Sequence, residues 1–415
     1  MPDKNLSNVL FSKSKKKPET SILIHRMDHQ DKQAYAEPDS TMGWYRVLKR
    51  AQWIWMGIDP VDQEAILARI TTNEHPRSYP DLLDTVVGYI PGNWIYEWTK
   101  VGMNFQKKAQ ELAQNKQDQD AGLNYLKASA YFSVAAYPYL KEDELATHAI
   151  TLAHKNYEQG VKKLQYSLEY MDIKVEGKTT KAVLHLPKNM PNSPIPVLIV
   201  CAGLDISHTE LWRLYHEHVA TQQWAMVSLD MPSFGYSQHI PMTENISVLH
   251  EALLEKIAQH PYLDQDKIAG LGIRLGANAL TRLAYLKPKN LKAVASLSPM
   301  CHTFFKKEGI KHNIPDMYLD ILASSLGKKE YQSHFLLGQF SAWSLKHQGL
   351  LGIKKSSVPF HSISLKNDPV CPLEEAKLIA SSSREGSYVQ LEDQPLYSAY
   401  ERTISEAINW LKNYI

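Results

Sequence analysis

The sequence lacks the features that mark several large classes of protein. Its 415 residues include only three cysteines, and their wide separation argues against a disulfide framework or a zinc site. No stretch is long and apolar enough to cross a membrane, and residues 1–20 have no apolar core of the signal-peptide kind. The formal net charge is only +2, so nucleic acid is not expected as the main partner. These absences predict a cytoplasmic protein that binds neither nucleic acid nor a membrane.

What is present fits a globular protein of two units. Hydrophobic residues make up 44% and charged residues 22%, in a chain longer than one hydrophobic core usually supports. Residues 1–40 are polar without a sustained period and are expected to form a poorly ordered tail. Residues 41–165 are expected to form a helical N-terminal domain. Apolar residues recur there at helical spacing, in stretches near 81–89, 94–115, 119–137 and 142–163.

From residue 166 onwards, short apolar runs alternate with helical segments. PVLIVCAGL, WAMVSLDMP, KIAGLGI and VPFHSISL are typical of strands buried on both faces. Two further strands precede them, joined by a turn at 176–178. The alternation predicts an α/β fold for residues 166–415, with a doubly wound, mostly parallel sheet of the α/β-hydrolase type. Helical sequence at about 301–357 is expected to form a lid insertion above the strand ends.

The turn after KIAGLGI carries an arginine where a nucleophile would be expected. Gly272, Arg274 and Gly276 have the spacing of G-x-S-x-G, the strand-to-helix elbow that presents a catalytic serine in α/β-hydrolases. Arginine stays protonated in proteins and cannot attack a carbonyl. The sequence therefore predicts a hydrolase elbow without its usual nucleophile.

The rest of a catalytic triad is also incomplete. Asp368 follows the elbow in the chain order of a Ser-Asp-His hydrolase. No histidine occurs after His361, so the base that should precede the last helix is missing. The three positions predict a pseudo-triad rather than an active one.

Two roles are open for Arg274. It can pin neighbouring strand ends through salt bridges to Asp205 and Asp368, since a buried charge needs a partner. Alternatively, beside the helix N-terminus at Gly276, it can bind an anionic or carbonyl-bearing ligand. Gly203 lies where hydrolases keep an oxyanion-hole amide, although a plain turn would also suit glycine. Asp205 can also simply cap the following helix.

Other side chains near the strand ends are weaker candidates. Ser233 and Ser237 lie in a Pro/Gly loop and could be displaced nucleophiles. Cys301 and His302 could act as a thiol and base, or His302 alone as a pocket acid or base, against a purely structural role. The tryptophans either pack helices or line the pocket; the two concerned are Trp212 and Trp343.

Several longer motifs together resemble one known family. They are AGLD with the following LWRL, DMPSFGYS, GIRLGAN, MYLDILASSLG, AWSLKHQG and NDPVCP. The chain resembles the fermentation–respiration switch protein family, FrsA, over nearly all of its length. The likeness implies an α/β-hydrolase fold with a helical N-terminal domain, and pocket positions at Asp205, Trp212 and Arg274. Ile273 and Leu275 depart from the family's usual G-F-R-F-G-x-N, which bears on pocket shape.

The resemblance also implies an activity and a partner. The expected activity is hydrolysis of simple carboxylic esters, weak here for want of serine and histidine, and linked to carbon metabolism. The expected alternative is a non-catalytic regulator that binds the unphosphorylated glucose-specific IIA component of the sugar phosphotransferase system. No cofactor or metal ion is expected, and the ligand would be a small ester or carboxylate. The expected catalytic residues are Arg274, Asp205, His302 and Asp368, and the expected pocket residues are Gly203, Leu204, Trp212, Ser233 and Gly276.

Overall fold

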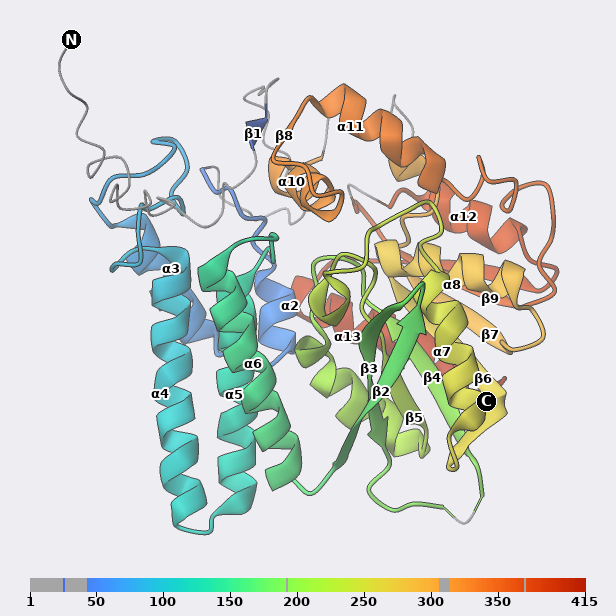
Figure 1. The fold of residues 1–415 in the computed structure, drawn as a ribbon, viewed down its shortest axis with the longest axis horizontal. Coiled ribbons are helices and arrows are strands. Elements are labelled where there is room, and N and C mark those ends of the chain that lie inside the picture. The colour runs from blue at the N-terminus through green and yellow to red at the C-terminus, as the bar shows by residue number, and fades with distance from the viewer. Residues whose placement is uncertain (1–24, 27–42, 192, 306–313, 369–370) are drawn as a thin grey trace.

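The computed structural model describes residues 25–26, 43–191, 193–305, 314–368 and 371–415 (Figure 1). The tail expected at residues 1–40 therefore lies almost entirely outside the described residues. Of that segment only β1 (His25–Arg26) is described, and it pairs in parallel with β8 (Glu330–Tyr331).

Helices make up most of the N-terminal part of the chain. They are α2 (Arg50–Trp55), α3 (Pro60–Thr71), α4 (Trp94–Gln114), α5 (Asp118–Ala136) and α6 (Glu144–Lys163). Helix α3 begins where Asp59 accepts hydrogen bonds from the amides of Val61 and Asp62, with Pro60 in its first turn. Helices α4, α5 and α6 lie side by side (Figure 1).

The helix expected near residues 81–89 is wrong, because that segment forms turns. Its Asp84 carboxylate is used in tertiary contacts instead. It accepts hydrogen bonds from the amides of Tyr45 and Arg46, at 2.8 and 3.1 Å, and pairs with the Arg46 guanidinium at 3.0 Å. These long-range bonds hold the segment in a non-helical conformation.

An eight-stranded sheet forms the other part, in the order β10-β9-β7-β6-β4-β5-β3-β2. Pairing is parallel except where β3 meets β2 and β5. The predicted turn at 176–178 joins β2 to β3. The strands are β2 (Ser167–Val175), β3 (Lys178–Leu186), β4 (Ile195–Cys201), β5 (Ala225–Ser228), β6 (Leu263–Ile273), β7 (Ala293–Leu297), β9 (Phe360–Leu365) and β10 (Gly386–Leu391). The predicted α/β-hydrolase type of sheet is confirmed.

The apolar runs are continuous because the central strands are covered on both faces. Along β4, Val197 and Ile199 pack into one hydrophobic cluster, whereas Leu198 and Val200 pack into the other. The helices beside the sheet are α7 (Val248–Gln259), α8 (Leu275–Leu286), α12 (Leu373–Ser381) and α13 (Leu396–Leu411). Between β4 and β5 the chain is helical, with 3-10 turns at His208–Leu211 and Ala220–Gln222 on either side of a π-helical segment at Leu214–Val219.

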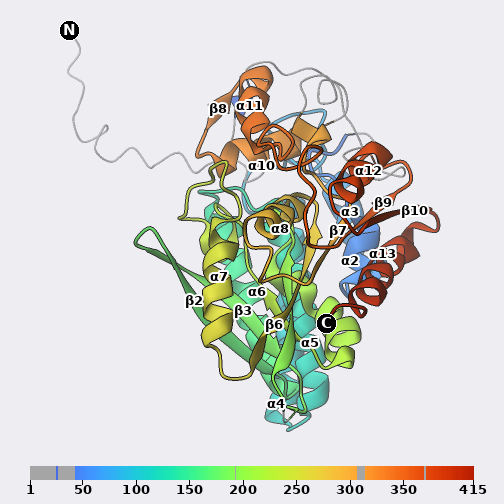
Figure 2. The ribbon, with the colours of Figure 1, turned by 90° about the vertical axis from the view of Figure 1, so that its right-hand side faces the viewer.

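A lid segment connects β7 to β9. It contains α10 (Asp316–Ser325), β8 and α11 (Ser333–Phe340). Both helices lie above the sheet in two perpendicular views (Figures 1 and 2). The two helices are separated at Gly327, which has a φ of +70° and ends the first of them. Within the described ranges, the helices are all too short or too polar to traverse a bilayer.

Early and late parts of the chain meet where α2 packs against α13. The Tyr400 hydroxyl donates to Gln52 Oε1 at 2.7 Å, and Trp55 Nε1 donates to Glu401 Oε2 at 2.9 Å. Trp55 also belongs to the hydrophobic cluster that covers one face of the sheet. Through α2, the helical part is therefore fixed to the C-terminal helix.

Candidate functional site

Arg274 lies at a sharp turn between β6 and α8. Its φ of 54° and ψ of −121° are unusual for a residue with a side chain, and such conformations cost about 1–3 kcal/mol. Three backbone bonds hold it there. The Arg274 amide donates to Leu297 O at 3.0 Å, and its carbonyl accepts from the amides of Ala277 and Met300 at 3.1 and 3.2 Å. The surrounding backbone therefore fixes the elbow geometry.

The glycines of the elbow are required by close backbone contacts. A Cβ atom on Gly276 would lie 2.0 Å from Cys201 O, and one on Gly272 would lie 2.3 Å from Ala277 Cα. Gly203 has a φ of +83°, which side chains rarely adopt, and it faces the elbow backbone. The glycine spacing that predicted an elbow thus has a steric cause.

The guanidinium of Arg274 pairs with Asp368. Its Nη1 lies 2.8 Å from each carboxylate oxygen, and the Asp368 and Arg274 side chains are 2% and 22% exposed. Burial works against the charge of Arg274, but the Asp368 carboxylate more than compensates, and the pKa of the guanidinium is raised. Of the two partners expected for Arg274, Asp368 is therefore the one it binds.

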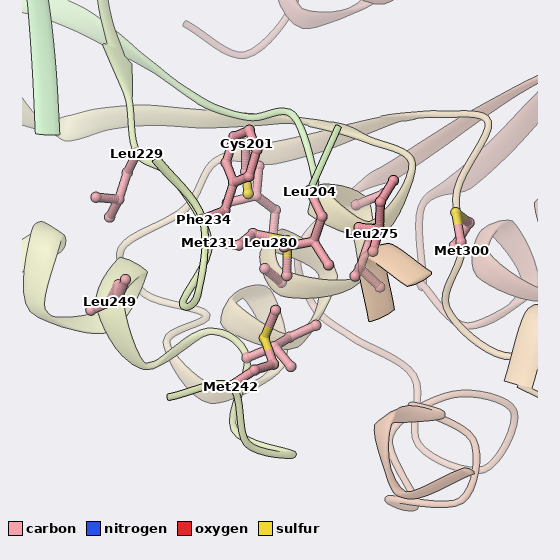
Figure 3. Packing of buried hydrophobic residues seen from close by; sticks show 14 of the residues in the cluster. Cys201, Leu204, Leu229, Met231, Phe234, Met242, Leu249, Leu275, Leu280 and Met300 are labelled. Carbon is pink, nitrogen blue, oxygen red and sulfur yellow. The ribbon is translucent and has the colours of Figure 1, made fainter. Parts of the chain in front are cut away.

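The other side of Arg274 faces a small cavity. Among the described residues, no protein acceptor lies within hydrogen-bonding distance of Arg274 Nε or Nη2. The cavity has a volume of about 30 Å³, enough for water or a small chemical group. Its walls are mostly apolar, and Figure 3 shows two of the lining residues, Leu204 and Leu275, among the buried hydrophobic side chains. The lining residues are Leu204, Asp205, Arg274, Leu275, Met300, Phe304, Tyr318, Ile321 and Leu322.

Two backbone amides beside this cavity are free of protein acceptors in the described part of the chain. They belong to Leu275, which begins α8, and to Leu204, in the loop after β4. These are the two positions from which α/β-hydrolases build an oxyanion hole. Donors for a carbonyl oxygen are thus present even though the elbow residue is arginine.

Tyr318, from α10 of the lid, was not identified by the sequence analysis. Its hydroxyl has no hydrogen-bond partner among the described residues. Burial, together with the negative charge of Asp205, raises the pKa of Tyr318 well above its ordinary value. The hydroxyl therefore stays protonated and can donate into the cavity. A tyrosine within an apolar helix gives no signal in the sequence that distinguishes this role from packing.

Asp205 binds Lys49 rather than Arg274. Lys49 Nζ donates to the Asp205 carboxylate and, at 3.2 Å, to the Asp205 backbone carbonyl. The ammonium also lies 4.9 Å from the ring centre of Tyr137, a cation–π distance. Lys49 was another residue missed by the sequence analysis, and it brings the helical part of the chain to the cavity.

Asp205 does not cap the helical turn that follows it. Ser207 does so, in a capping box with Glu210. Glu210 Oε1 accepts from the Ser207 amide at 2.8 Å and from the Tyr139 hydroxyl. Burial raises the pKa of Glu210 to about 7, despite these bonds and the charge of Lys49.

Cys301 and His302 lie away from the cavity lining. Both backbone amides donate to Glu375 Oε1 at 2.6 Å, and His302 Nδ1 lies 2.7 Å from Ser344 Oγ. Burial, and then the charge of Glu375, raises the pKa of the Cys301 thiol well above its ordinary value. The geometry gives this pair structural contacts and does not bring His302 to Arg274.

Four more candidates have structural contacts elsewhere. The Ser233 hydroxyl donates to Ser325 O at 2.7 Å, and Ser237 Oγ lies 2.9 Å from Thr180 Oγ1. The Trp212 ring stacks on His216 at 5.3 Å, within an aromatic cluster outside the cavity lining. Trp343 packs on Phe340 within the lid, with ring centres 4.2 Å apart.

One group among the described residues has the spacing of metal ligands, and it lies away from the cavity. It consists of Glu217, His218 and Glu401. Arg213 Nε already pairs with Glu217 at 2.8 Å, and Arg213 Nη2 lies 3.9 Å from Glu401. Because an arginine occupies the carboxylates, this group gives no support for a metal ion.

Comparison with known proteins places the chain in a family. A family model described as "Esterase FrsA-like" matches residues 1–415. The chain is 44% identical to the Esterase FrsA of Photobacterium profundum over 411 residues, covering 99% of this chain and 98% of that protein. It is 40% identical to the Esterase FrsA of Vibrio parahaemolyticus, with the same coverage.

Solved structures show the same fold at lower sequence identity. The structure of 2,6-dihydroxy-pseudo-oxynicotine hydrolase has a TM-score of 0.70 at 16% identity, covering 88% of this chain and 95% of that one. Wild-type AbyA5 has a TM-score of 0.65 at 16% identity, covering 86% and 90%. With a family model that matches its whole length and relatives at 40–44% identity, the chain belongs to the FrsA-like esterase family.

Proposed function

We propose that this protein is a carboxylic-ester hydrolase of low activity, with the ester carbonyl bound in the cavity at Arg274. The observation that carries the proposal is a convergence of hydrogen-bond donors. Two nitrogens of Arg274 and the amides of Leu204 and Leu275 border one apolar-lined cavity without acceptors from the described residues. Membership of an esterase family supports the same reaction class.

The donors would stabilise the charge that develops on the carbonyl oxygen. Water attacks the carbonyl carbon, and its proton passes to the Asp205 carboxylate at the cavity wall. The bond to the leaving oxygen then breaks, with a hydrogen bond from Tyr318, and the alkoxide takes the proton from Asp205. The products are a carboxylic acid and an alcohol, and one oxyanion donor contributes about 10²–10³-fold. The rate is low because the Asp205 carboxylate, which accepts the proton, is already paired with Lys49.

The proposal is tested with short-chain p-nitrophenyl esters. Replacing Arg274 alone removes the cation that pairs with the Asp368 carboxylate, so the informative variant is Arg274→Met/Asp368→Asn, which removes both charges. Tyr318→Phe removes only a hydroxyl. We expect kcat/KM to fall at least about 100-fold in the first and about tenfold in the second, consistent with lost charge-assisted hydrogen bonds. Arg384→Ala is the matched control, because Arg384 is exposed and its side chain makes no hydrogen bond or ion pair with the described residues. Full activity of the double variant would overturn the proposal.

A second candidate function is that of a regulator without catalysis. The specific observation in its favour is that the described cavity lining contains no serine, cysteine or histidine. In this alternative the protein binds the unphosphorylated glucose-specific IIA protein in the cytoplasm and links it to carbon metabolism. Calorimetric titration with unphosphorylated and phosphorylated IIA tests it. The regulator is favoured if only the unphosphorylated form binds and if esters are hydrolysed no faster than by heat-denatured protein.

A further inference from the structure

We propose that Lys49, from the helical part of the chain, is a positioning residue that keeps Asp205 from closing the open face of Arg274. The proposal rests on the proposed function insofar as that face is the one that binds the ester. It adds that the helical part controls the charge balance of the cavity.

Two opposite charges border the same cavity without pairing with each other. Asp205 and Arg274 are both lining residues, yet the structure records no ion pair between them. Two separate pairs exist instead, Lys49 with Asp205 and Arg274 with Asp368. Lys49 thus takes the carboxylate that would otherwise be available to Arg274.

The Lys49–Asp205 pair is itself well buried. The two side chains are 10% and 8% exposed. An unpaired carboxylate at such a position is strongly disfavoured. If Lys49 were neutral, the Asp205 carboxylate would need another partner. The donors available across the cavity are the Nε–H and Nη2–H groups of Arg274, which have no acceptor among the described residues. A new Asp205–Arg274 pair would then occupy the donors that the ester needs.

The backbone around Lys49 is fixed by its neighbours. Lys49 O accepts from Trp53 N at 2.9 Å in the first turn of α2, and Val47 O accepts from the Tyr137 hydroxyl at 3.0 Å. The Tyr137 ring also contacts the Lys49 ammonium. In Figure 1, α2 lies between the long helices and α13. The ammonium is therefore held in one position relative to the cavity, as a positioning role requires.

Other ionisable groups around Asp205 do not replace Lys49. Glu210 and the tyrosines 137, 139 and 318 surround the pair, and when charged they are all anionic. Lys49 and Arg274 are thus the cations that the structure places beside Asp205. Removal of one leaves only the other.

The experiment measures binding of acetate, a product of the proposed reaction class, by calorimetry and thermal shift. We expect Lys49→Met to weaken acetate binding at least about tenfold. Lys49→Met/Asp205→Asn should restore it to within about threefold, because the competing carboxylate is gone. Lys49→Arg keeps the charge and should resemble the wild type. Lys292→Met is the control, since Lys292 is exposed and its side chain makes no hydrogen bond or ion pair with the described residues.

Each outcome decides the matter. Unchanged acetate affinity in Lys49→Met overturns the proposal, as does a double variant no better than the single one. Failure of the wild type to bind acetate also overturns it. The double variant leaves no buried charge unpaired, so its far-UV circular dichroism separates a positioning effect from loss of the fold. If the acetate pattern holds but no ester is hydrolysed, the proposed function fails and the role of Lys49 stands.

Discussion

Replacing Asp368 by asparagine would leave the Arg274 guanidinium without its carboxylate partner. The pair has Nη1 at 2.8 Å from both oxygens, and the Asp368 side chain is 2% exposed. Two unit charges about 4 Å apart attract by about 4 kcal/mol at an effective dielectric constant of about 20. Breaking a buried pair from one side costs about 3–5 kcal/mol. Arg274 is 22% exposed, so water offsets part of this loss, and we expect Asp368→Asn to destabilise by about 3 kcal/mol.

The double variant Arg274→Met/Asp368→Asn isolates the ion pair. Asparagine keeps an Oδ1 that can accept from the Cys371 amide, as Asp368 does at 3.1 Å. With both charges removed, the loss should be no more than about 1 kcal/mol, since an apolar replacement of a buried pair is often nearly neutral. Urea unfolding, followed by circular dichroism and tryptophan fluorescence, measures both variants. If the double variant is as unstable as Asp368→Asn, the charge pairing does not account for the effect and the reasoning is refuted.

Three other expectations follow from packing, titration and burial. Gly276→Ala should destabilise the protein by about 3 kcal/mol or more, because the added Cβ would lie 2.0 Å from Cys201 O. Gly338→Ala in α11 should stabilise it by up to about 1 kcal/mol, because no atom lies within 4 Å of the added Cβ. Equal shifts of the melting temperature in the two variants would contradict this expectation. Because the pKa of Glu210 is raised from 4.5 to about 7, its contribution to stability is full below pH 4.5 and is lost as the pH rises through 7. The free energy of unfolding of Glu210→Gln, measured with urea and taken relative to that of the wild type at the same pH, should therefore be higher at pH 8 than at pH 5. A difference between the two proteins that does not change with pH would contradict this expectation. The three cysteines are buried, and burial raises the pKa of Cys201 to about 12, so a thiol reagent at pH 8 should label three thiols per chain only after denaturation; rapid labelling of native protein would show that they are accessible.

The sequence predicts most of the sheet because its signals are local. Runs such as PVLIVC alternate between two hydrophobic clusters, so burial on both faces is visible in the residues themselves. The elbow is predictable for the same reason, since Gly272 and Gly276 are needed by contacts within a few residues and with the adjacent strand. Asp368 was named, together with Asp205, as a partner of Arg274 because both follow neighbouring strands.

Contacts between distant segments were not predictable in this way. Lys49 lies 156 residues before Asp205, and an isolated lysine before a helix has the same appearance whether it is exposed or paired. The sequence analysis therefore expected Asp205 to pair with Arg274 or to cap the following helix. In the structure Asp205 pairs with Lys49, and Ser207 caps the helical turn. The prediction of a helix at 81–89 was wrong for a similar reason, because the hydrogen bonds of Asp84 to the distant Tyr45 and Arg46 amides override the local helical preference.

The contact between α2 and α13 has a consequence for the synthesis of the protein. Trp55 and Glu401, which bond across it, are 346 residues apart, so α2 leaves the ribosome long before its partner exists. Until the last helix emerges, the face of α2 that carries Trp55 has no cover from α13. A nascent chain that stalls before residue 396 would expose this apolar surface of α2, the helix that begins directly after Lys49, and a chaperone could bind it there.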